Sequence, residues 1–311
     1  MVTDGGKSDG RDIITTYRYL RISIAASAVW LFASVTETAT STHCIQNSLS
    51  AFYYTVTHSA FIGALCIIAG GLIVYQGSIF AEEVLLDFSG FMALVVAMVP
   101  TMPAPKNDPF VLHPCGLSLP TEDDGTVGTI NNVTSLLIAI AAGLLIYWAI
   151  RPLRRDGSDA RQPATDRTDA FPRFAGLLFA ASRVVVPLVV LAVLIAGAAW
   201  LAAAPDDFRL HAHRYAALAM FAGIALVAVF NACYAALEGR ATALAYIVIA
   251  VLMTLTLVVL ILLFTVVEVS GRPAILLFES ALIIEFAAFW LIQTRDLWHL
   301  CRYRPKPVVR A

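Results

Sequence analysis

Residues 241–267 read "ATALAYIVIAVLMTLTLVVLILLFTVV" and contain no charged side chain. An α-helix needs about 20 mostly apolar residues to cross the hydrocarbon core of a bilayer, and this segment is long enough. The rest of the chain has the same character, because 59% of all residues are hydrophobic and only 14% are charged, against about 25% charged residues in soluble domains. The sequence therefore predicts an all-α, polytopic transmembrane helix bundle.

The same length criterion predicts eight membrane spans, over residues 19–37, 56–75, 84–103, 132–150, 182–203, 214–237, 241–267 and 274–294. Arg18 and Arg21 stand near the start of the first span, and we expect their long side chains to reach back to the membrane interface. Residues 1–16 are polar and mixed in charge, and no small-residue cleavage site follows the first span. We therefore expect this span to be retained rather than removed as a signal peptide.

The distribution of basic residues predicts the orientation. With the N-terminus inside, the inner segments hold sixteen Lys and Arg residues and the outer segments hold four. Because cytoplasmic connections carry the excess of Lys and Arg, we expect both termini in the cytoplasm and the protein in the plasma (inner) membrane. The net charge of −1 gives no overall basic field, so the lipid bilayer is an expected partner and nucleic acid is not. No feature of the sequence names a protein partner.

The chain divides into two groups of four predicted spans. Residues 1–150 form a half with two long outer loops, at about 38–55 and 104–131. Residues 151–173 are rich in Asp, Arg, Pro and Gly, which predicts a flexible cytoplasmic linker. Residues 174–295 form the second half, and residues 296–311 form a basic cytoplasmic tail. The halves differ in loop length and show no internal repeat, so an inverted-repeat transporter architecture is not indicated.

The five cysteines differ in predicted location. Cys44 and Cys115 lie in the two long outer loops, and disulfides persist on the oxidising side of a membrane. We therefore expect a Cys44–Cys115 disulfide, with two free thiols as the alternative. Cys66 and Cys233 lie within spans, where an isolated cysteine packs as a small apolar residue.

Histidines gather on the predicted outer face and suggest a metal site. His58, His211 and His213 are the candidate ligands, and His43 and His113 lie on the same face. Histidine with carboxylate or thiolate is a ligand set of zinc, so zinc is the cofactor that such a site would take. No other cofactor is predicted, and none of these spacings is a recognised zinc motif.

The pair in "LHAHRY", residues 210–215, tests this idea by geometry. Residues two apart in an α-helix point about 200° apart around the axis, so His211 and His213 do not share one metal ion if they are helical. Pro205, Asp206 and Asp207 look like a helix start. The alternatives are one histidine in an outer polar cluster, titrating near neutral pH, or two interfacial histidines in contact with water and lipid headgroups.

Ionisable residues inside the hydrocarbon are the second group of candidates, because they are costly there and commonly functional. Glu285 stands near the middle of the last span, and Glu279 precedes it by six residues. The two are about 240° apart around a helix, so they do not form a simple acid–base pair. Either carboxyl is a candidate catalytic proton donor. The alternative for Glu285 is a protonated carboxyl that links two helices by a hydrogen bond.

Further polar residues are candidate partners or ligand contacts. Asn231 and Tyr234 lie in the sixth span, in "FNACY", and such side chains hydrogen-bond between membrane helices. Asp87 belongs to a small acidic group at the start of the third span. We expect Arg183 either to pair with Asp87 or to extend toward the cytoplasmic interface.

Three stretches carry a resemblance to known sequences: residues 49–77, "LSAFYYTVTHSAFIGALCIIAGGLIVYQG", residues 82–90, "EEVLLDFSG", and residues 278–293, "FESALIIEFAAFWLIQ". They resemble a family of uncharacterised eight-span bacterial integral membrane proteins. The resemblance implies the same topology and carries no activity across. The Ser, Asp and three His of intramembrane alkaline ceramidase-like hydrolases do not map onto this chain, which has no His-x-x-x-His pair.

Two main functions fit these features. The first is a membrane protein that binds or translocates a small or lipid-like molecule, with Glu285 as its polar centre. The second is an intramembrane enzyme acting on a lipophilic substrate, either an acid-catalysed cyclase or isomerase using Glu285 or Glu279, or a zinc hydrolase using the outer histidines. An accessory subunit of a membrane complex is a third possibility. If Glu285→Gln keeps full function, the acid-catalysis hypothesis fails.

Overall fold

The computed structural model describes residues 5–43, 45–101, 132–136, 138, 139, 142, 145, 170–265 and 273–298. Within these residues every regular element is a helix and no strand occurs, which confirms the all-α prediction. The elements are α1 (Gly5–Thr42), the 3-10 helix η1 (Ser50–Tyr54), α2 (His58–Val74), α3 (Phe80–Met98), α5 (Ala170–Ala203), α6 (Pro205–Leu237), α7 (Ala243–Thr265) and α8 (Pro273–Asp296).

Five helices are long and apolar enough to cross a membrane. They are the part of α1 from Thr15 onward, most of α5, and α6, α7 and α8. Helix α2 is equally apolar but has only 17 residues, and α3 carries Glu82 and Glu83 in its first turn. The predicted span at 132–150 lies mostly outside the described residues.

Several helices extend beyond the predicted spans. Helix α6 begins at Pro205 rather than at residue 214, with Pro at its start and Asp206 and Asp207 in its first turn. Proline suits the first helical position because its missing N–H needs no partner there, and acidic side chains favour the positive end of the helix dipole. His211 and His213 therefore lie on one helix and point in different directions.

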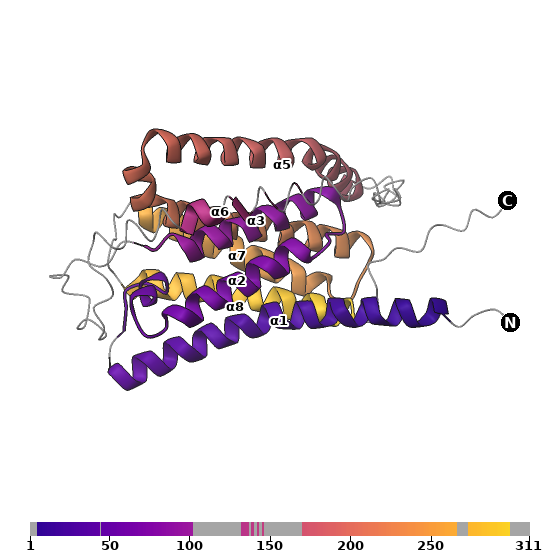
Figure 1. Cartoon of the computed structure of the whole chain (residues 1–311). Coiled ribbons are helices and arrows are strands. Elements are labelled where there is room, and N and C mark those ends of the chain that lie inside the picture. The colour runs from indigo at the N-terminus through magenta and orange to yellow at the C-terminus, as the bar shows by residue number, and fades with distance from the viewer. Residues whose placement is uncertain are drawn as a thin grey trace, which may run out of the picture.

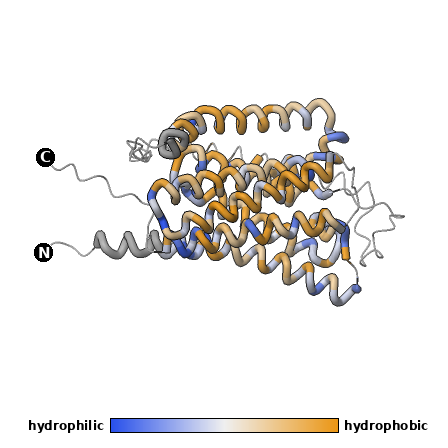
Figure 2. The backbone as a smooth tube through the Cα atoms, turned by 180° about the vertical axis from the view of Figure 1, so that it is seen from behind, coloured by the Kyte–Doolittle hydropathy of each residue, from blue (hydrophilic) through white to orange (hydrophobic). Residues whose placement is uncertain are grey.

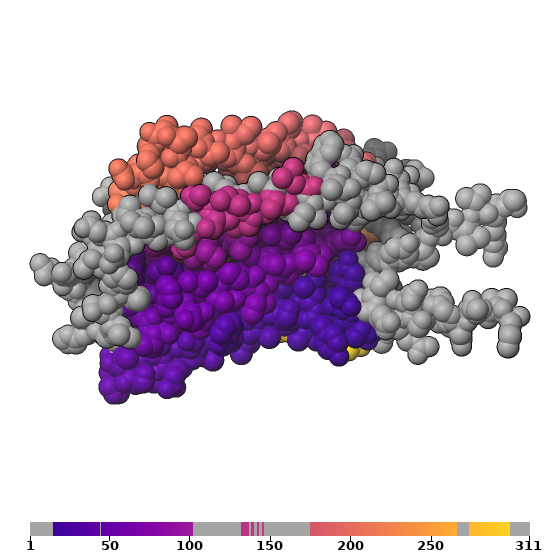
Figure 3. Space-filling view, viewed as in Figure 1, coloured from indigo at the N-terminus to yellow at the C-terminus, as the bar shows by residue number. Residues whose placement is uncertain are grey.

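Six helices form a closed ring. Around it, α1 packs against α2, α2 against α3, α3 against α6, α6 against α7, α7 against α8, and α8 against α1. The helices run roughly parallel or antiparallel to one another (Figure 1). Figure 3 shows α1, α2 and α3 as one continuous face of this ring.

Helix α5 lies outside the ring as a separate layer and packs on α3 and α6 (Figure 1). Most of its apolar side chains are exposed, including Leu188, Val189 and Ile195. The hydropathy colouring shows that hydrophobic residues predominate along the helices, including α5 (Figure 2). An apolar outer surface of this size is what a protein surrounded by lipid requires.

Small residues bring α2 close to its neighbours. A Cβ atom added at Gly71 would lie 2.4 Å from Cγ1 of Ile24 in α1. A Cβ atom added at Gly90 of α3 would lie 2.8 Å from the carbonyl oxygen of Ala69 in α2. Glycine is therefore needed at both positions for the observed helix separation, as expected where helices associate inside a membrane.

The ring has two different ends. At one, which we call the arginine end, α1 begins and α8 finishes: Arg18 Nε donates to the Trp298 carbonyl at 2.8 Å, and Arg240 lies between α6 and α7. At the other, which we call the η1 end, the segment around η1 meets the start of α8, where Leu276 N–H donates to the Asn47 carbonyl at 3.1 Å.

Candidate functional site

The candidate site is a partly enclosed cavity inside the ring, close to the η1 end. Its volume is about 50 Å³. All six ring helices and the segment around η1 contribute to its walls, which are apolar apart from Ser50, Arg214 and Glu279. The apolar wall residues include Leu31, Leu65, Val96, Phe221, Leu260 and Ile283. Because each helix of the ring supplies part of the wall, the cavity exists only in the assembled bundle.

Glu279 is the acidic group of the cavity and is held from the η1 side. Its Oε2 accepts hydrogen bonds from the backbone N–H of Leu49 at 2.6 Å and from that of Ser50 at 3.4 Å. Hydrogen bonds from backbone N–H groups to a carboxylate are of the strong, charge-assisted type. They fix the Glu279 carboxyl at the cavity wall.

Arg214 is the basic group of the cavity. Its guanidinium carbon lies 5.2 Å from the ring centre of Tyr215 and 5.6 Å from that of Phe264, within the range of cation–π contact. Within the described part of the chain, no hydrogen bond or ion pair to Arg214 is found. The positive charge is therefore placed beside an apolar cavity without an anionic partner from these residues.

The size of the cavity limits what it holds. Since a water molecule occupies about 30 Å³ of the liquid, about 50 Å³ admits a small polar head or a short piece of hydrocarbon and not a whole lipid. A larger ligand would lie partly outside the cavity, which is not fully closed.

Tyr54 lies beside this site at the end of η1. Its hydroxyl donates to the carbonyl of Thr101, just beyond α3, at 2.5 Å. Burial raises the pKa of Tyr54 to about 12, and the neighbouring Tyr53 adds to this while Arg209 opposes it. The phenol therefore stays a hydrogen-bond donor at neutral pH.

Glu285 does not line the cavity. It lies between α7 and α8, where its Oε1 accepts a hydrogen bond from the Thr256 hydroxyl at 2.8 Å. Its Oε2 is buried and has no hydrogen-bond partner among the described residues. Glu279 faces η1 and Glu285 faces α7, so the two carboxyls belong to separate surroundings.

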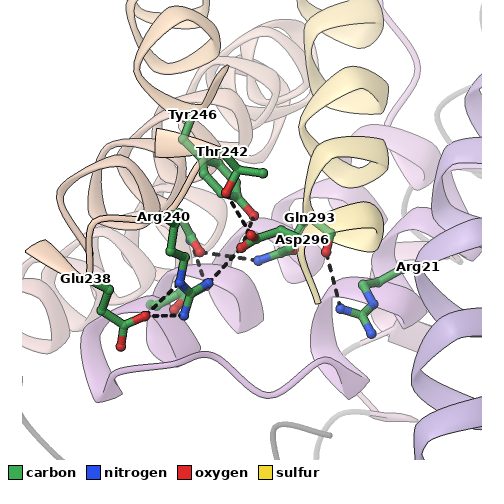
Figure 4. A network of polar contacts seen from close by, with 9 residues as sticks. Arg21, Glu238, Arg240, Thr242, Tyr246, Gln293 and Asp296 are labelled. Atoms are coloured by element: carbon green, nitrogen blue, oxygen red, sulfur yellow. Dashed lines mark hydrogen bonds and ion pairs between the residues drawn. The ribbon is translucent and has the colours of Figure 1, made fainter. Parts of the chain in front are cut away.

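A buried polar layer closes the bundle toward the arginine end. Asn231 of α6 donates to Oε1 of Glu82 in α3 at 2.9 Å, and its own Oδ1 accepts from Gln293 of α8 at 3.3 Å. Arg21 is only 2% exposed, and its guanidinium lies 3.5 Å from the carbonyl oxygen of Gln293 (Figure 4). Arg21 is therefore covered by α8, which supplies an acceptor, while its Nε donates to the Tyr17 carbonyl one turn toward the start of α1; that it reaches the membrane interface stays a prediction.

A second polar cluster lies near the ends of α6 and α8 (Figure 4). Asp296 accepts from Arg240 Nη1 at 2.7 Å and from the Thr242 hydroxyl at 2.7 Å. Partial burial lowers the pKa of Arg240, but the hydrogen bonds and charges of Asp296 and Glu238 outweigh this and raise it. Tyr234, a candidate ligand contact from sequence, lies under this guanidinium at 5.3 Å and belongs to the cluster.

Asp87 and Arg183 do not meet. Both side chains are exposed, and no ion pair joins them among the residues that the structure describes. The two candidates therefore carry no site here.

The candidate zinc ligands make separate contacts. His58 Nδ1 donates to the Tyr53 carbonyl at 2.8 Å, His211 binds Asp207 of the preceding turn, and buried His213 donates to the Val99 carbonyl at 2.6 Å. No group of three metal-binding side chains occurs in the described ranges. His113 and both cysteines of the predicted disulfide, Cys44 and Cys115, lie outside those ranges, whereas Cys66 and Cys233 are free.

Comparisons with protein family models, with curated proteins and with solved structures gave no match. The chemistry of the site therefore follows from its own geometry. An apolar cavity with one fixed carboxyl and one guanidinium suits a molecule that has both a polar head and an apolar part.

Proposed function

We propose that this protein is a multi-pass membrane protein that binds a small lipid-like molecule with an anionic head in the cavity of the helix ring. The observation that carries the proposal is the position of Arg214, a cation in a mostly apolar wall that forms no ion pair with the described residues, while Glu279 of the same wall is bonded to the backbone at Leu49. A charge in such surroundings is costly unless it is paired. A carboxylate or phosphate head would supply that pair, while the apolar walls accept hydrocarbon.

The arrangement of the ends supports the eight-span topology. Helix α3 finishes at the η1 end, where Val99 meets His213. Helix α5 begins toward the arginine end, since Phe179 packs against Phe230 near the end of α6 with ring centres 6.1 Å apart. The chain between α3 and α5 has to return from one end to the other, and the apolar segment 132–150 is long enough to do so.

The same arrangement supports the proposed orientation. Arg18, Arg21 and Arg240 all lie at the arginine end, and basic residues are concentrated on the cytoplasmic side of membrane proteins. If the arginine end lies on the cytoplasmic side of the plasma membrane, the cavity lies toward the outer side. The ligand is then a molecule of the outer half of the bilayer or of the space beyond it.

The proposal is tested with a photoactivatable fatty acid, palmitic acid carrying a diazirine, on the full chain in lipid nanodiscs. We expect crosslinks to residues of the cavity wall, identified by mass spectrometry. Ile283→Trp should reduce this crosslinking about tenfold, which corresponds to about 1.4 kcal/mol of binding free energy, because Ile283 lines the cavity and is 9% exposed.

Ile284→Trp is the matched control, since the neighbouring isoleucine is 58% exposed and faces away from the cavity. It should bind like the wild type. Arg214→Gln should weaken crosslinking of the fatty acid more than that of the uncharged alcohol with the same chain. Equal crosslinking of both isoleucine variants, or crosslinks spread over the exposed face of α5, would show that the cavity does not bind such molecules.

A further inference from the structure

Glu285 stands outside the proposed binding cavity and is not explained by it. The carboxyl lies between α7 and α8, bonded through Oε1 to Thr256 at 2.8 Å. The other oxygen, Oε2, is buried and meets no hydrogen-bonding group within the described ranges. A carboxylate normally accepts several hydrogen bonds when it is charged, and here the described residues provide one.

Among the described residues, no basic side chain forms an ion pair with this carboxyl. Helix α7 contains no Lys, Arg, His, Asp or Glu between Ala243 and Thr265, and its one titratable side chain, Tyr246, contacts Asp296 at the arginine end. Along α8, Glu279 is six residues away, or about 9 Å along the axis, and Arg295 is ten residues away, or about 15 Å. Glu279, another acid, is therefore too distant to share a proton with Glu285, and Arg295 is too distant for a direct ion pair.

Three arginines of the other ring helices also make contacts elsewhere. On α1, Arg18 and Arg21 contact Trp298 and Gln293 near the end of α8. On α6, Arg214 lines the cavity beside Phe264. Among the described residues, the Thr256 hydroxyl is therefore the one hydrogen-bond partner found for Glu285, and with so little compensation a buried carboxylate is far less favourable than a neutral carboxyl.

The position is also close to the outer surface of the ring. Glu285 itself is partly exposed, although its Oε2 is buried, and the neighbouring Ile284 and Leu255 are 58% and 57% exposed. In a membrane these side chains contact lipid. Small apolar molecules dissolved in the lipid would reach the seam between α7 and α8 from that side.

We propose that Glu285 is a proton-binding site within the membrane, a carboxyl that keeps its proton and is reached from the lipid phase. The proposal does not depend on the cavity or on its ligand. Its chemical consequence is reaction with apolar carbodiimides, which modify protonated carboxyls that lie in lipid.

The reaction balances without a further reactant. The carboxyl O–H adds across one C=N bond of the carbodiimide: the proton goes to nitrogen, and the carboxyl oxygen bonds to the central carbon. The O-acylisourea that forms rearranges to a stable N-acylurea by transfer of the acyl group to nitrogen. No atom is lost, so the modified peptide gains the mass of one reagent molecule.

The test treats the full chain in lipid nanodiscs with N,N′-dicyclohexylcarbodiimide and locates the modification by mass spectrometry. We expect labelling of Glu285 and equal labelling at about pH 6 and about pH 8, since the carboxyl stays protonated over this range. A water-soluble, cationic carbodiimide should label Glu285 at least tenfold less.

Glu285→Gln should remove the label, whereas Glu279→Gln should keep it. The amide closely matches the shape of a neutral carboxyl, so Glu285→Gln should unfold at the same temperature as the wild type. The labelling of Glu285 in the wild-type chain tests the proposal even if a variant fails to fold. Absence of the label from Glu285, or labelling that disappears between pH 6 and pH 8, would overturn the proposal.

Discussion

The contact between α2 and α3 makes a quantitative prediction about stability. Replacing Gly90 by Ala adds a methyl group 2.8 Å from the carbonyl oxygen of Ala69 and 2.7 Å from Cγ1 of Ile73. Ile73 is exposed and is free to turn toward the lipid, but the Ala69 oxygen belongs to the backbone of α2. The two helices must therefore move apart.

The expected magnitude follows from these distances. Ordinary Cβ contacts begin at 3.4 Å, so the helices have to separate by roughly 0.6 Å at this point, a strain of the kind that costs about 1–3 kcal/mol when a packed core is overfilled. Alanine also gains roughly 0.5–1 kcal/mol over glycine in a helix interior. A control variant with the same helix gain is therefore needed, so that the difference between the two variants measures the strain alone.

Gly70→Ala is the control for this helix gain. Gly70 lies within α2, four residues before its last residue, with nothing within 4 Å of the added Cβ atom, so this variant receives the helix gain without the strain. The free energy of unfolding of Gly90→Ala should lie about 1–3 kcal/mol below that of Gly70→Ala. Denaturant titration in detergent micelles, followed by the fluorescence of buried Trp290, measures the difference. Equal stability of the two variants would refute the close approach of α2 and α3.

Three further predictions use the same assay. Asn231→Leu leaves Gln293 without a buried acceptor and should cost about 1–3 kcal/mol; a neutral effect would contradict the buried layer. Arg240→Gln removes the pair to Asp296 and should cost roughly 1 kcal/mol. Because the folded state raises the pKa of Arg240, its contribution is complete below the unfolded value and is lost only at higher pH, so the loss should be constant from about pH 6 to about pH 9. Burial raises the pKa of Tyr54 from 10.0 to about 12. The free energy of unfolding of the wild type should therefore fall as the pH rises from about 10 to about 12, and that of Tyr54→Phe should fall less.

The sequence predicted helices where hydropathy alone decides. Helix α7, Ala243–Thr265, lies within the predicted 241–267 because its length is set by an uninterrupted apolar run. Helix α6 begins earlier than predicted, because hydropathy reports the apolar part of a helix and not its polar start at Pro205. The start of α6 therefore follows its polar first turn, with Pro205 and two aspartates, rather than the apolar length.

The site was predicted only in part, because it depends on which helices are neighbours. Glu279 stood out as an acid in an apolar span, but nothing in the sequence placed it against Leu49, which is 230 residues away. Arg214 is one of the four basic residues of the predicted outer segments, and nothing in the sequence places it in a cavity wall, where the ring puts it. The contact of Asn231 with Glu82 likewise spans 149 residues. Periodicity finds polar positions, whereas the order of helices around the ring requires tertiary structure.

The contact between α1 and α8 has a consequence for the order in which the bundle assembles. Arg21 and Gln293 are 272 residues apart, so α1 is synthesised well before its neighbour. During that interval the guanidinium lacks the carbonyl of Gln293, and the bundle has an open side. Helix α8, which is made last, therefore completes the surroundings of α1, which is made first. A chain whose synthesis stops before α8 cannot form the closed ring.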